Sequence, residues 1–294
     1  MGWTAYTLAF RLHSPLHIGL AKTGNLKQCR EYVPGRILWA ALTARLTRDF
    51  LRKGADSQAY LDTGEKVRAC FRFCYLYPAV PKTHNNEITS AVDLCGPAYR
   101  WKHANFDYQF VGSYASTALD YSGQTAEDGS LHETEHLLPY SRPVQGSATQ
   151  PVFLRGTVYV DDQAETDPVL KNWKAAMKDL QLGAERKYGW GRVSLVALPA
   201  SGEKKEEAKI SLTKDGVLTA HAVAVSKNGL GAVANIRGPV EPLVGWEYAA
   251  DPAGKSKWKL TREPLLCYAP GAKIDLGDQD IMELNIDPYG LLYT

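Results

Sequence analysis

A twelve-residue segment in the second half of the chain combines the residue types that bind phosphates and bases. It reads LGAERKYGWGRV, from Leu182 to Val193. Its glycines are Gly183, Gly189 and Gly191, its cations are Arg186, Lys187 and Arg192, and its aromatic residues are Tyr188 and Trp190. Glycines permit positive φ and close backbone approach, so that several N–H groups can point at one phosphate. The cations neutralise phosphate charge and the rings offer faces to bases, and the combination predicts binding of single-stranded RNA.

Two other phosphate-binding motifs do not fit this segment. It lacks the Gly-Lys-Ser/Thr ending of a P-loop, and the preceding residues are expected to form a helix rather than a strand. It also lacks the G-x-G-x-x-G spacing of a dinucleotide-binding fold. A glycine-rich turn from helix to strand, with solvated cations and packed rings, remains an open alternative.

Two further segments are expected to contact RNA near this loop. The turn LHIGLAKTG supplies His17, Gly19 and Lys22, and a helix beginning near Pro34 supplies Gly35 and Arg36 in its first turn. A helix N-terminus favours anions, so this pair of segments would form a second phosphate shelf.

A second basic and aromatic patch is predicted in the segment YRWKHANFDY. It contains Arg100, Trp101, Lys102 and His103. The patch fits a second contact with RNA or a protein partner. A surface loop with anchoring aromatic rings is an equally open interpretation.

Catalysis is not expected, although several residues are candidates for it. A phosphodiester cut needs a positioned acid, base or metal ion. Candidate carboxylates are Asp93, Asp107 and Asp120, and candidate histidines are His13, His17, His132 and His136. None of them lies in a recognisable signature, and solvated carboxylates are the favoured interpretation of the three aspartates.

A zinc site is a further alternative. Cys70 and Cys74 are separated by three residues, with His84 and Cys95 further along the chain. Such a set could hold zinc, but the spacing lies at the permissive edge and the segment CFRFC alternates as a strand carrying buried thiols. The expectation is no metal and no cofactor.

The elements that would position these residues follow from hydrophobic periodicity. Leu8, Phe10 and Leu12 alternate as a strand, and the segment VFLRGTVYVD alternates as another. A helix is predicted from Pro34, with apolar residues recurring every four positions. A second helix is predicted from an Asp167 N-cap to its end at Gly183, and the strand RVSLVAL follows the loop. This order is compatible with a ferredoxin-like β-α-β-β-α-β unit carrying a long insertion. The apolar stripe of the first helix is Leu38, Leu42, Leu46 and Phe50, and that of the second is Leu170, Trp173, Met177 and Leu180.

Composition indicates an ordinary soluble globular protein, and the order of predicted strands and helices indicates an α+β fold. The 294 residues are 45% hydrophobic and 22% charged, and the net charge is only +2, so a basic surface must be local. The charged segment ASGEKKEEAK predicts a boundary between a domain at 1–200 and a smaller β-rich domain at 201–294. In the second domain a hairpin is expected to turn at Asp215 and Gly216.

Localisation in the cytoplasm is expected. The apolar runs fall far short of the ~20 residues that cross a bilayer, and no signal peptide is discernible. Five scattered cysteines suit reduced thiols better than a disulfide framework.

Several segments, taken in order, resemble one superfamily. They are SPLHIG (14–19), YVPGRILWAAL (32–42), TALDYSGQTAEDGSLHETEHLLP (117–139) and the glycine loop. The chain resembles the RAMP proteins of CRISPR effector complexes. The segment CFRFCYLYPAVPKT and the hundred-residue continuation after the loop, with LVGWEY and APGAKI, are similar to the Cas five group. Within it they resemble the Csx ten-like form of type III-D systems. The usual second glycine-rich loop of that group is reduced here to DPYGLLYT.

The resemblance implies a fold and a function. It implies a RAMP domain that is ferredoxin-like (RRM-like) with insertions, followed by a degenerate second domain of the same kind. It implies a non-catalytic, crRNA-binding subunit that caps the 5′ handle beside the large signalling subunit and the RAMP backbone subunits, meets target RNA only indirectly, and serves antiviral defence.

The resemblance also implies an inserted thumb at about 100–142. Thr117, Leu119, Asp120, Thr125 and Leu131 would break the stacking of the guide there. The open alternatives are a RAMP backbone subunit, Cas seven-like, that cuts target RNA with a thumb aspartate, and an endoribonuclease that processes crRNA.

Overall fold

The computed structural model of the chain consists mostly of β-sheet, with few helices. It describes residues 2–51, 54–81, 83–84, 87–88, 105–144, 148–198, 200, 205–213, 216–225, 229–232, 235–250, 256–260, 265–277 and 280–294. The chain divides into two compact units, residues 1–208 and 209–294. None of the helices in the described part of the chain is both long and apolar enough to cross a membrane.

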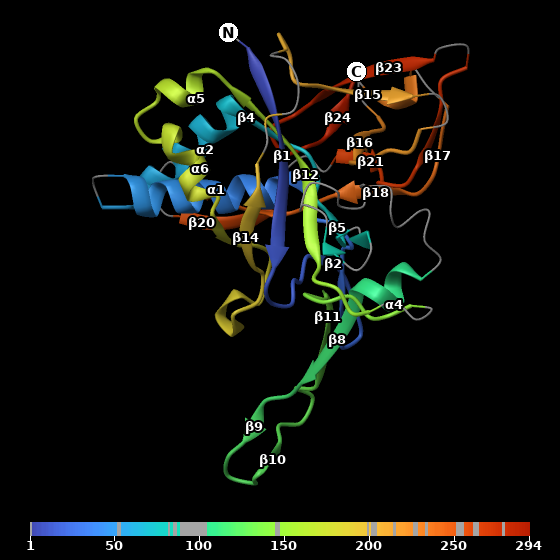
Figure 1. Ribbon diagram of the computed structural model, residues 1–294. Helices are drawn as coiled ribbons and strands as arrows, with labels where there is room; N and C mark the ends of the chain where they lie inside the picture. The colour runs from blue at the N-terminus through green and yellow to red at the C-terminus, as the bar shows by residue number, and fades with distance from the viewer. Residues whose placement is uncertain are drawn as a thin grey trace. The chain divides into compact units, whose positions relative to one another are not determined.

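The first unit is organised around a six-stranded antiparallel sheet. Its strands are β1 (Trp3–Leu12), β4 (Phe71–Phe73), β5 (Tyr77–Ala79), β12 (Phe153–Asp161), β13 (Asp179–Gln181) and β14 (Arg192–Ala197). They lie in the order β13-β14-β1-β12-β4, and β5 extends the pairing of β12 beyond β4. β1 is therefore central, between β12 and β14 (Figure 1). The predicted strands around Leu8, in VFLRGTVYVD and in RVSLVAL are confirmed.

One face of this sheet packs against helix α1 (Gly35–Phe50). Leu8, Phe10 and Leu12 of β1 are fully buried in the same core as Leu38 and Leu42 of the helix. Pro34 occupies the N-cap, where its missing N–H has no intrahelical partner. The predicted first helix and its apolar stripe are thus confirmed, although Phe50 at the last position is only half-buried.

Helix α2 (Ser57–Cys70) was not predicted. Asp56 caps it, with its carboxylate accepting a hydrogen bond of 2.7 Å from the amide of Ala59. The buried face consists of Thr63, Gly64, Val67 and Cys70, which are small or weakly apolar. A stripe of this kind gives no strong helical periodicity, which explains why the sequence pattern missed it.

The predicted second helix, from Asp167 to Gly183, is wrong as a continuous element. The structure has two helical turns in α5 (Gln163–Thr166) and α6 (Trp173–Ala176), joined through the 3₁₀ turn η1 (Leu170–Asn172). The chain then enters β13, where Leu180 pairs with Val193 of β14. Pairing with β14 satisfies backbone groups that a helix would otherwise have bonded internally, while Leu180 still reaches the core.

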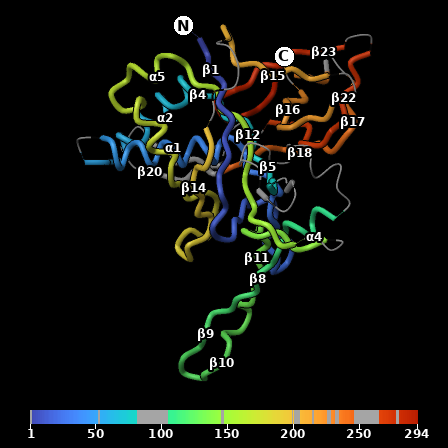
Figure 2. The backbone as a smooth tube through the Cα atoms, in the orientation of Figure 1, coloured from blue at the N-terminus to red at the C-terminus, as the bar shows by residue number. Residues whose placement is uncertain are grey.

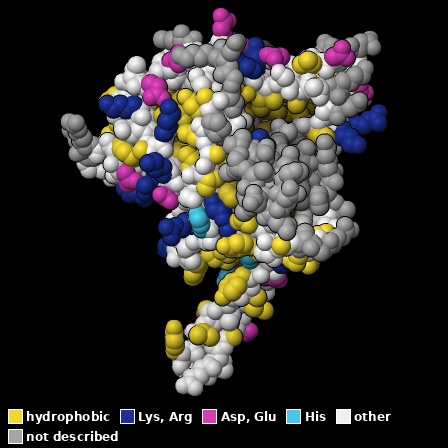
Figure 3. All heavy atoms as spheres, viewed as in Figure 1, with side chains coloured by type: hydrophobic (Ala, Val, Ile, Leu, Met, Phe, Trp, Pro, Cys, Tyr) yellow, Lys and Arg dark blue, Asp and Glu magenta, His cyan; other side chains and the backbone are white. Residues whose placement is uncertain are grey.

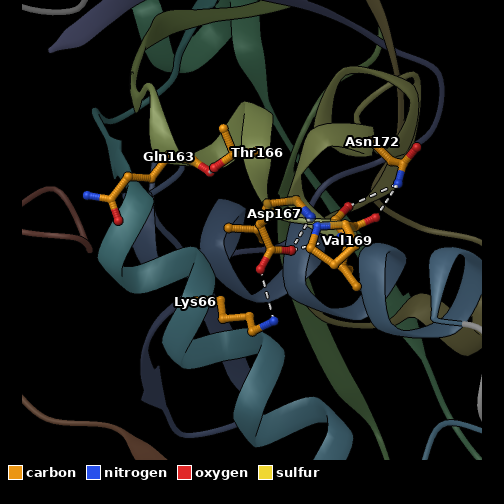
Figure 4. Close-up of polar contacts among 8 residues, drawn as sticks. Lys66, Gln163, Thr166, Asp167, Val169 and Asn172 are labelled. Atoms are coloured by element: carbon orange, nitrogen blue, oxygen red, sulfur yellow. Dashed lines mark hydrogen bonds and ion pairs between the residues drawn. The ribbon is translucent and has the colours of Figure 1, made fainter. Parts of the chain in front are cut away.

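Asp167 lies two residues before the N-cap of η1, Val169, and does not begin a long helix. Its Oδ1 accepts hydrogen bonds from the amides of Val169 (2.8 Å) and Leu170 (2.9 Å). Its Oδ2 accepts one from Nζ of Lys66 on α2, at 2.9 Å. Figure 4 shows this carboxylate between the 3₁₀ turn and α2. It therefore ties the two helical segments together.

A second, four-stranded sheet carries a long hairpin, here called the thumb hairpin (residues 111–137). The sheet order is β2 (Gly19–Thr23), β3 (Leu26–Cys29), β11 (His132–Leu137) and β8 (Val111–Ser116). The short pair β9 (Leu119–Asp120) and β10 (Thr125–Ala126) forms the tip. Figures 1 and 2 show the hairpin projecting away from the six-stranded sheet. Helix α4 (Phe106–Phe110) precedes it, and the pair β6 (Thr83–His84) and β7 (Glu87–Ile88) lies earlier in the chain.

The second unit is β-rich. Its main sheet has the order β15 (Lys209–Thr213), β23 (Ile281–Ile286), β24 (Leu292–Tyr293), β16 (Ala222–Val223), β21 (Leu265–Tyr268) and β18 (Val240–Leu243). Two pairs accompany it: β17 (Asn235–Arg237) with β22 (Lys273–Asp275), and β19 (Trp246–Ala250) with β20 (Ser256–Leu260). The 3₁₀ turn η3 (Leu230–Ala232) is the sole helical segment in the described part of this unit.

The predicted hairpin turns at Asp215, which lies outside the described residues, and Gly216, but the two strands expected to form it do not pair with each other. β15 pairs with β23, whereas β16 pairs with β21 and β24. The amide of Gly216 does bond the carbonyl of Thr213, so the chain turns there. The strands on either side of that turn then find long-range partners, which local turn chemistry cannot reveal.

Candidate nucleic-acid interface

The glycine loop connects two antiparallel strands, β13 and β14, rather than a helix and a strand. The amide of Leu182 donates to the carbonyl of Gly191 at 2.8 Å and closes the loop. Gly191 has φ +77°, and a Cβ there would lie 1.8 Å from the carbonyl oxygen of Leu182. Gly183 has φ +73°, and its Cβ would lie 2.3 Å from the carbonyl oxygen of His17. These two glycines are therefore required by backbone geometry.

The loop is bound to the segment after β1. The amide of Gly191 donates to the carbonyl of Pro15 at 2.7 Å, and that of Ala184 to the carbonyl of His17 at 2.9 Å. The amide of Arg192 donates to Oγ of Ser14 at 2.9 Å. The SPLHIG turn and the glycine loop are far apart in the sequence, but these three hydrogen bonds hold them side by side.

Several backbone amides of the loop already donate hydrogen bonds within the protein. Those of Ala184, Tyr188, Gly189 and Gly191 all donate to backbone carbonyls of the chain. The expectation that the amides of residues 183–191 together hold a phosphate is wrong for these four N–H groups. Recognition of an anion by the loop must rely more on its side chains.

The loop cations are exposed. Arg186, Lys187 and Arg192 all have exposed side chains, and none of the three forms an ion pair with any residue in the described ranges. Glu185 instead pairs with Lys27 of β3 at 3.1 Å, and this ion pair ties the loop to the β2–β3 hairpin. Three positive charges therefore remain available on one well-anchored loop.

The two loop aromatics differ in their surroundings. Tyr188 is 80% exposed. Trp190 is half-buried and lies edge-on to His136 of β11, with ring centroids 4.9 Å apart. Its ring also approaches Tyr114 of β8 edge-on, at 6.4 Å. Tyr188 offers an open face for stacking, while Trp190 joins the loop to the base of the thumb hairpin.

The predicted contacts in the turn after β1 divide into two kinds. Gly19 and Lys22 lie on β2 and are exposed. His17 is buried, and its Nδ1 hydrogen-bonds the carbonyl of Glu135 at 2.7 Å. Burial of the His17 ring beside β11 therefore argues against the predicted contact of this ring with RNA.

The predicted phosphate shelf at the start of α1 has limited access. Gly35 is buried, and Arg36 is half-buried with interaction partners of its own. The first turn has no side-chain cap, since its N-cap residue is Pro34. Burial of Gly35 argues against close approach of a phosphate to that backbone position.

The predicted thumb residues lie along the distal half of the hairpin. Leu119 and Leu131 are about 60% exposed, and Thr117 and Thr125 are exposed. Asp120 is exposed in β9, where its carboxylate accepts hydrogen bonds from the hydroxyl and the amide of Ser122. Those bonds lower the pKa of Asp120, so it is a carboxylate at neutral pH.

Part of the predicted set falls on residues that the structure does not describe. Arg100, Trp101, Lys102 and His103 lie outside the described residues, as do Asp93 and Cys95. Cys70 is buried at the end of α2, and burial raises the pKa of the Cys74 thiol to about 12. Within the described ranges no group of three or more His, Cys, Asp or Glu side chains could hold a metal ion.

Several residues of the interface were missed from the sequence. Tyr114, His136, Lys27 and Glu185 contact the loop or belong to it, yet none was predicted as an RNA contact. Tyr114 is 59% exposed on β8, and because single exposed apolar residues are common on protein surfaces, nothing in the sequence singled it out. Figure 3 shows Lys and Arg side chains gathered around a histidine where β14 begins.

Comparison with known proteins gives matches in structure only. No family model and no curated protein matches the sequence. A chain of a cryo-EM structure of the type III-B Cmr-beta bound to cognate target RNA and AMPPnP, state 1, is 12% identical. It aligns over 91% of this chain and 85% of its own length, with a TM-score of 0.49. A chain of the complex bound to cognate target RNA is 13% identical over 91% and 86%, with a TM-score of 0.47. One from the apo state is 11% identical over 66% and 96%, with a TM-score of 0.39.

Proposed function

We propose that this chain is a non-catalytic RNA-binding subunit of a type III CRISPR effector complex that holds the 5′ handle of the crRNA. One observation carries the proposal: Arg186, Lys187 and Arg192 stand unpaired among the described residues beside an exposed Tyr188, on a loop anchored at both ends. Unpaired cations beside an open aromatic face are what single-stranded nucleic acid requires.

The fold supports this assignment through its strand order. Leaving the edge strand β13 aside, the strands β14, β1, β12 and β4 are the fourth, first, third and second in chain order, and helices follow the first and third. This order supports the proposal of a ferredoxin-like β-α-β-β-α-β unit. The first unit is proposed to be a RAMP domain of the Cas five group, Csx ten-like, and the second a degenerate domain of the same kind.

The loop would bind RNA mainly through side chains. Arg186, Lys187 and Arg192 would contact phosphates, and Tyr188 would stack on a splayed base. Trp190, held between His136 and Tyr114, would fix the direction of the loop relative to the thumb hairpin. The thumb hairpin, with Leu119 and Leu131 exposed, would break base stacking at one position of the guide.

The partners of such a subunit would be other proteins of the complex. They would be the large signalling subunit and the RAMP backbone subunits, with target RNA reached only through the guide. The protein would act in the cytoplasm.

The test is crosslinking of the purified chain to a labelled crRNA, followed by identification of the crosslinked nucleotides. The proposal predicts crosslinks from Tyr188 to the 5′ handle, and loss of binding when the handle sequence is removed. Crosslinks confined to the guide region would contradict the handle assignment.

The same RNA with a matched target, incubated with and without divalent metal, separates a binder from a nuclease. The proposal predicts intact RNA. Cleavage that disappears in Asp120→Ala would instead favour a backbone subunit that cuts target RNA, and cleavage that disappears in a histidine variant such as His13→Ala would favour a crRNA-processing endoribonuclease.

A further inference from the structure

The face of the six-stranded sheet opposite α1 begins beside the glycine loop. Arg192 and Ser194 of β14 lie on this face, because Val193 between them is buried in the core. Arg11 of β1 pairs with Ser194 on one side and with Phe153 of β12 on the other. The side chains of Ser194, Arg11 and Phe153 therefore form a continuous row across three neighbouring strands, starting at the end of the loop.

His13 extends this row next to Arg192. It is exposed, its Nε2 lies 2.7 Å from Oγ of Ser194, and its amide donates to the carbonyl of Arg192 at 2.9 Å. Asp179 of β13 pairs with Ser194 and is the acidic side chain that acts electrostatically on His13, against Arg11 and Arg192. With two arginines and one aspartate around His13, the local net charge is positive.

Arg11 supports an exposed aromatic ring. Its Nη1 donates to the carbonyls of Leu12 (2.6 Å), Pro139 (2.8 Å) and Val152 (2.9 Å), which fix its position. The guanidinium carbon lies 4.7 Å from the ring centroid of Tyr140, and that tyrosine is 55% exposed. One face of the ring is occupied by a cation, and the residue retains a large open surface.

We propose that this row, which runs from Arg192 through His13 to Tyr140, is a second subsite for the same RNA strand. It would bind the nucleotides that follow those held by the glycine loop, with the ring of Tyr140 supported by Arg11. The inference rests on the proposed function of the loop. Arg192 and His13 would contact a phosphate, and a base would stack on Tyr140. The basic side chains visible where β14 begins lie on this face of the sheet (Figures 1 and 3). Single-stranded RNA is the occupant that the charge and the open ring favour.

The test measures the affinity of the full chain for RNA oligonucleotides of about four and about ten nucleotides, since a site of this kind spans roughly that range. Tyr140→Ala should weaken binding of the longer oligonucleotide by about tenfold, and His13→Ala by a few-fold. Tyr140→Phe keeps the ring and should bind as the wild type does. Tyr60→Ala, on α2 and so away from this face, is the matched control.

The outcomes separate this subsite from the loop. Loss confined to the longer oligonucleotide supports the proposal. Unchanged affinity in Tyr140→Ala and His13→Ala, with loss in Arg186→Ala/Lys187→Ala, which removes loop cations outside this row, overturns the subsite but not the loop. Equal loss at both lengths also overturns a separate subsite. A wild-type chain that binds neither oligonucleotide overturns the proposed function, and this inference with it. Thermal unfolding of each variant checks that it is folded.

Discussion

Trp190 of the glycine loop lies edge-on to His136 of the thumb hairpin, with ring centroids 4.9 Å apart and planes at 62°. This contact joins a loop near residue 190 to a strand more than fifty positions earlier. It fixes the orientation of the glycine loop, and therefore the side from which the loop cations would approach an RNA strand lying along the thumb hairpin.

The Trp190–His136 contact should contribute measurably to stability. Edge-to-face aromatic pairs contribute about 0.5–1.5 kcal/mol beyond their buried area. A double-mutant cycle of Trp190→Ala and His136→Ala, followed by urea unfolding, should give a coupling free energy of about that size. Strict additivity would mean that the two rings do not interact in solution.

Stability should also depend on the protonation of His136. Burial lowers the pKa of this histidine, with Arg142 and His17 acting in the same direction. The unfolded chain then takes up a proton near the ordinary value of 6.5, before the folded chain does. The contribution of neutral His136 is therefore complete above pH 6.5 and is lost as the pH falls from there through the folded pKa. His136→Gln should flatten the fall in unfolding free energy over that range, and an unchanged pH profile would contradict this account.

Two glycines of the loop should respond very differently to alanine. A Cβ at Gly191 would lie 1.8 Å from the carbonyl oxygen of Leu182, whereas one at Gly189 meets nothing within 4 Å. Both have positive φ, which costs an alanine about 1–2 kcal/mol. Gly189→Ala should lose roughly that much, and Gly191→Ala about 3–5 kcal/mol. Equal losses in chemical denaturation would show that the loop backbone differs from this description.

Removal of the Asp167 carboxylate should destabilise the helical segment after β12. Asp167→Ala leaves two amides of the 3₁₀ turn without their acceptor and should cost about 1 kcal/mol. Lys66→Met is the matched control, because it removes only the ion pair of 2.9 Å, and exposed pairs contribute about 0–1 kcal/mol. An equal effect of both substitutions on thermal unfolding would assign the stabilisation to the ion pair instead.

The sequence predicted the elements with strong periodicity. The strand through Leu8, Phe10 and Leu12 and the helix with Leu38 and Leu42 are as expected, because each places apolar residues on one face at a regular interval. The segment after Asp167 has helical spacing because Leu170, Trp173, Met177 and Leu180 are all buried, but these residues lie in a 3₁₀ turn, in and just after a short helix, and in a strand. The spacing of apolar residues alone could not distinguish this arrangement from one continuous helix.

The candidate site was only partly accessible to sequence reasoning. Local composition predicted a cationic, aromatic glycine loop, and the cations are exposed and unpaired among the described residues. Three long-range contacts could not be predicted from the sequence. They are the hydrogen bond of the His17 ring to the carbonyl of Glu135, the ion pair of Lys27 with Glu185, and the edge-on contact of Tyr114 with Trp190. Each depends on how the thumb hairpin and the β2–β3 hairpin pack beside the loop.

The most direct test of the central claim is the salt dependence of RNA binding in Arg186→Ala/Arg192→Ala. Each phosphate contact on single-stranded RNA adds about 0.7 to the slope of log affinity against log salt concentration. The double variant should bind handle RNA more weakly, with a slope reduced by about 1.4, two such contacts. The charge-matched control Arg48→Ala/Lys171→Ala, on α1 and η1, should keep the wild-type slope. A folded Arg186→Ala/Arg192→Ala protein with unchanged affinity and slope would contradict the assignment of this loop to RNA.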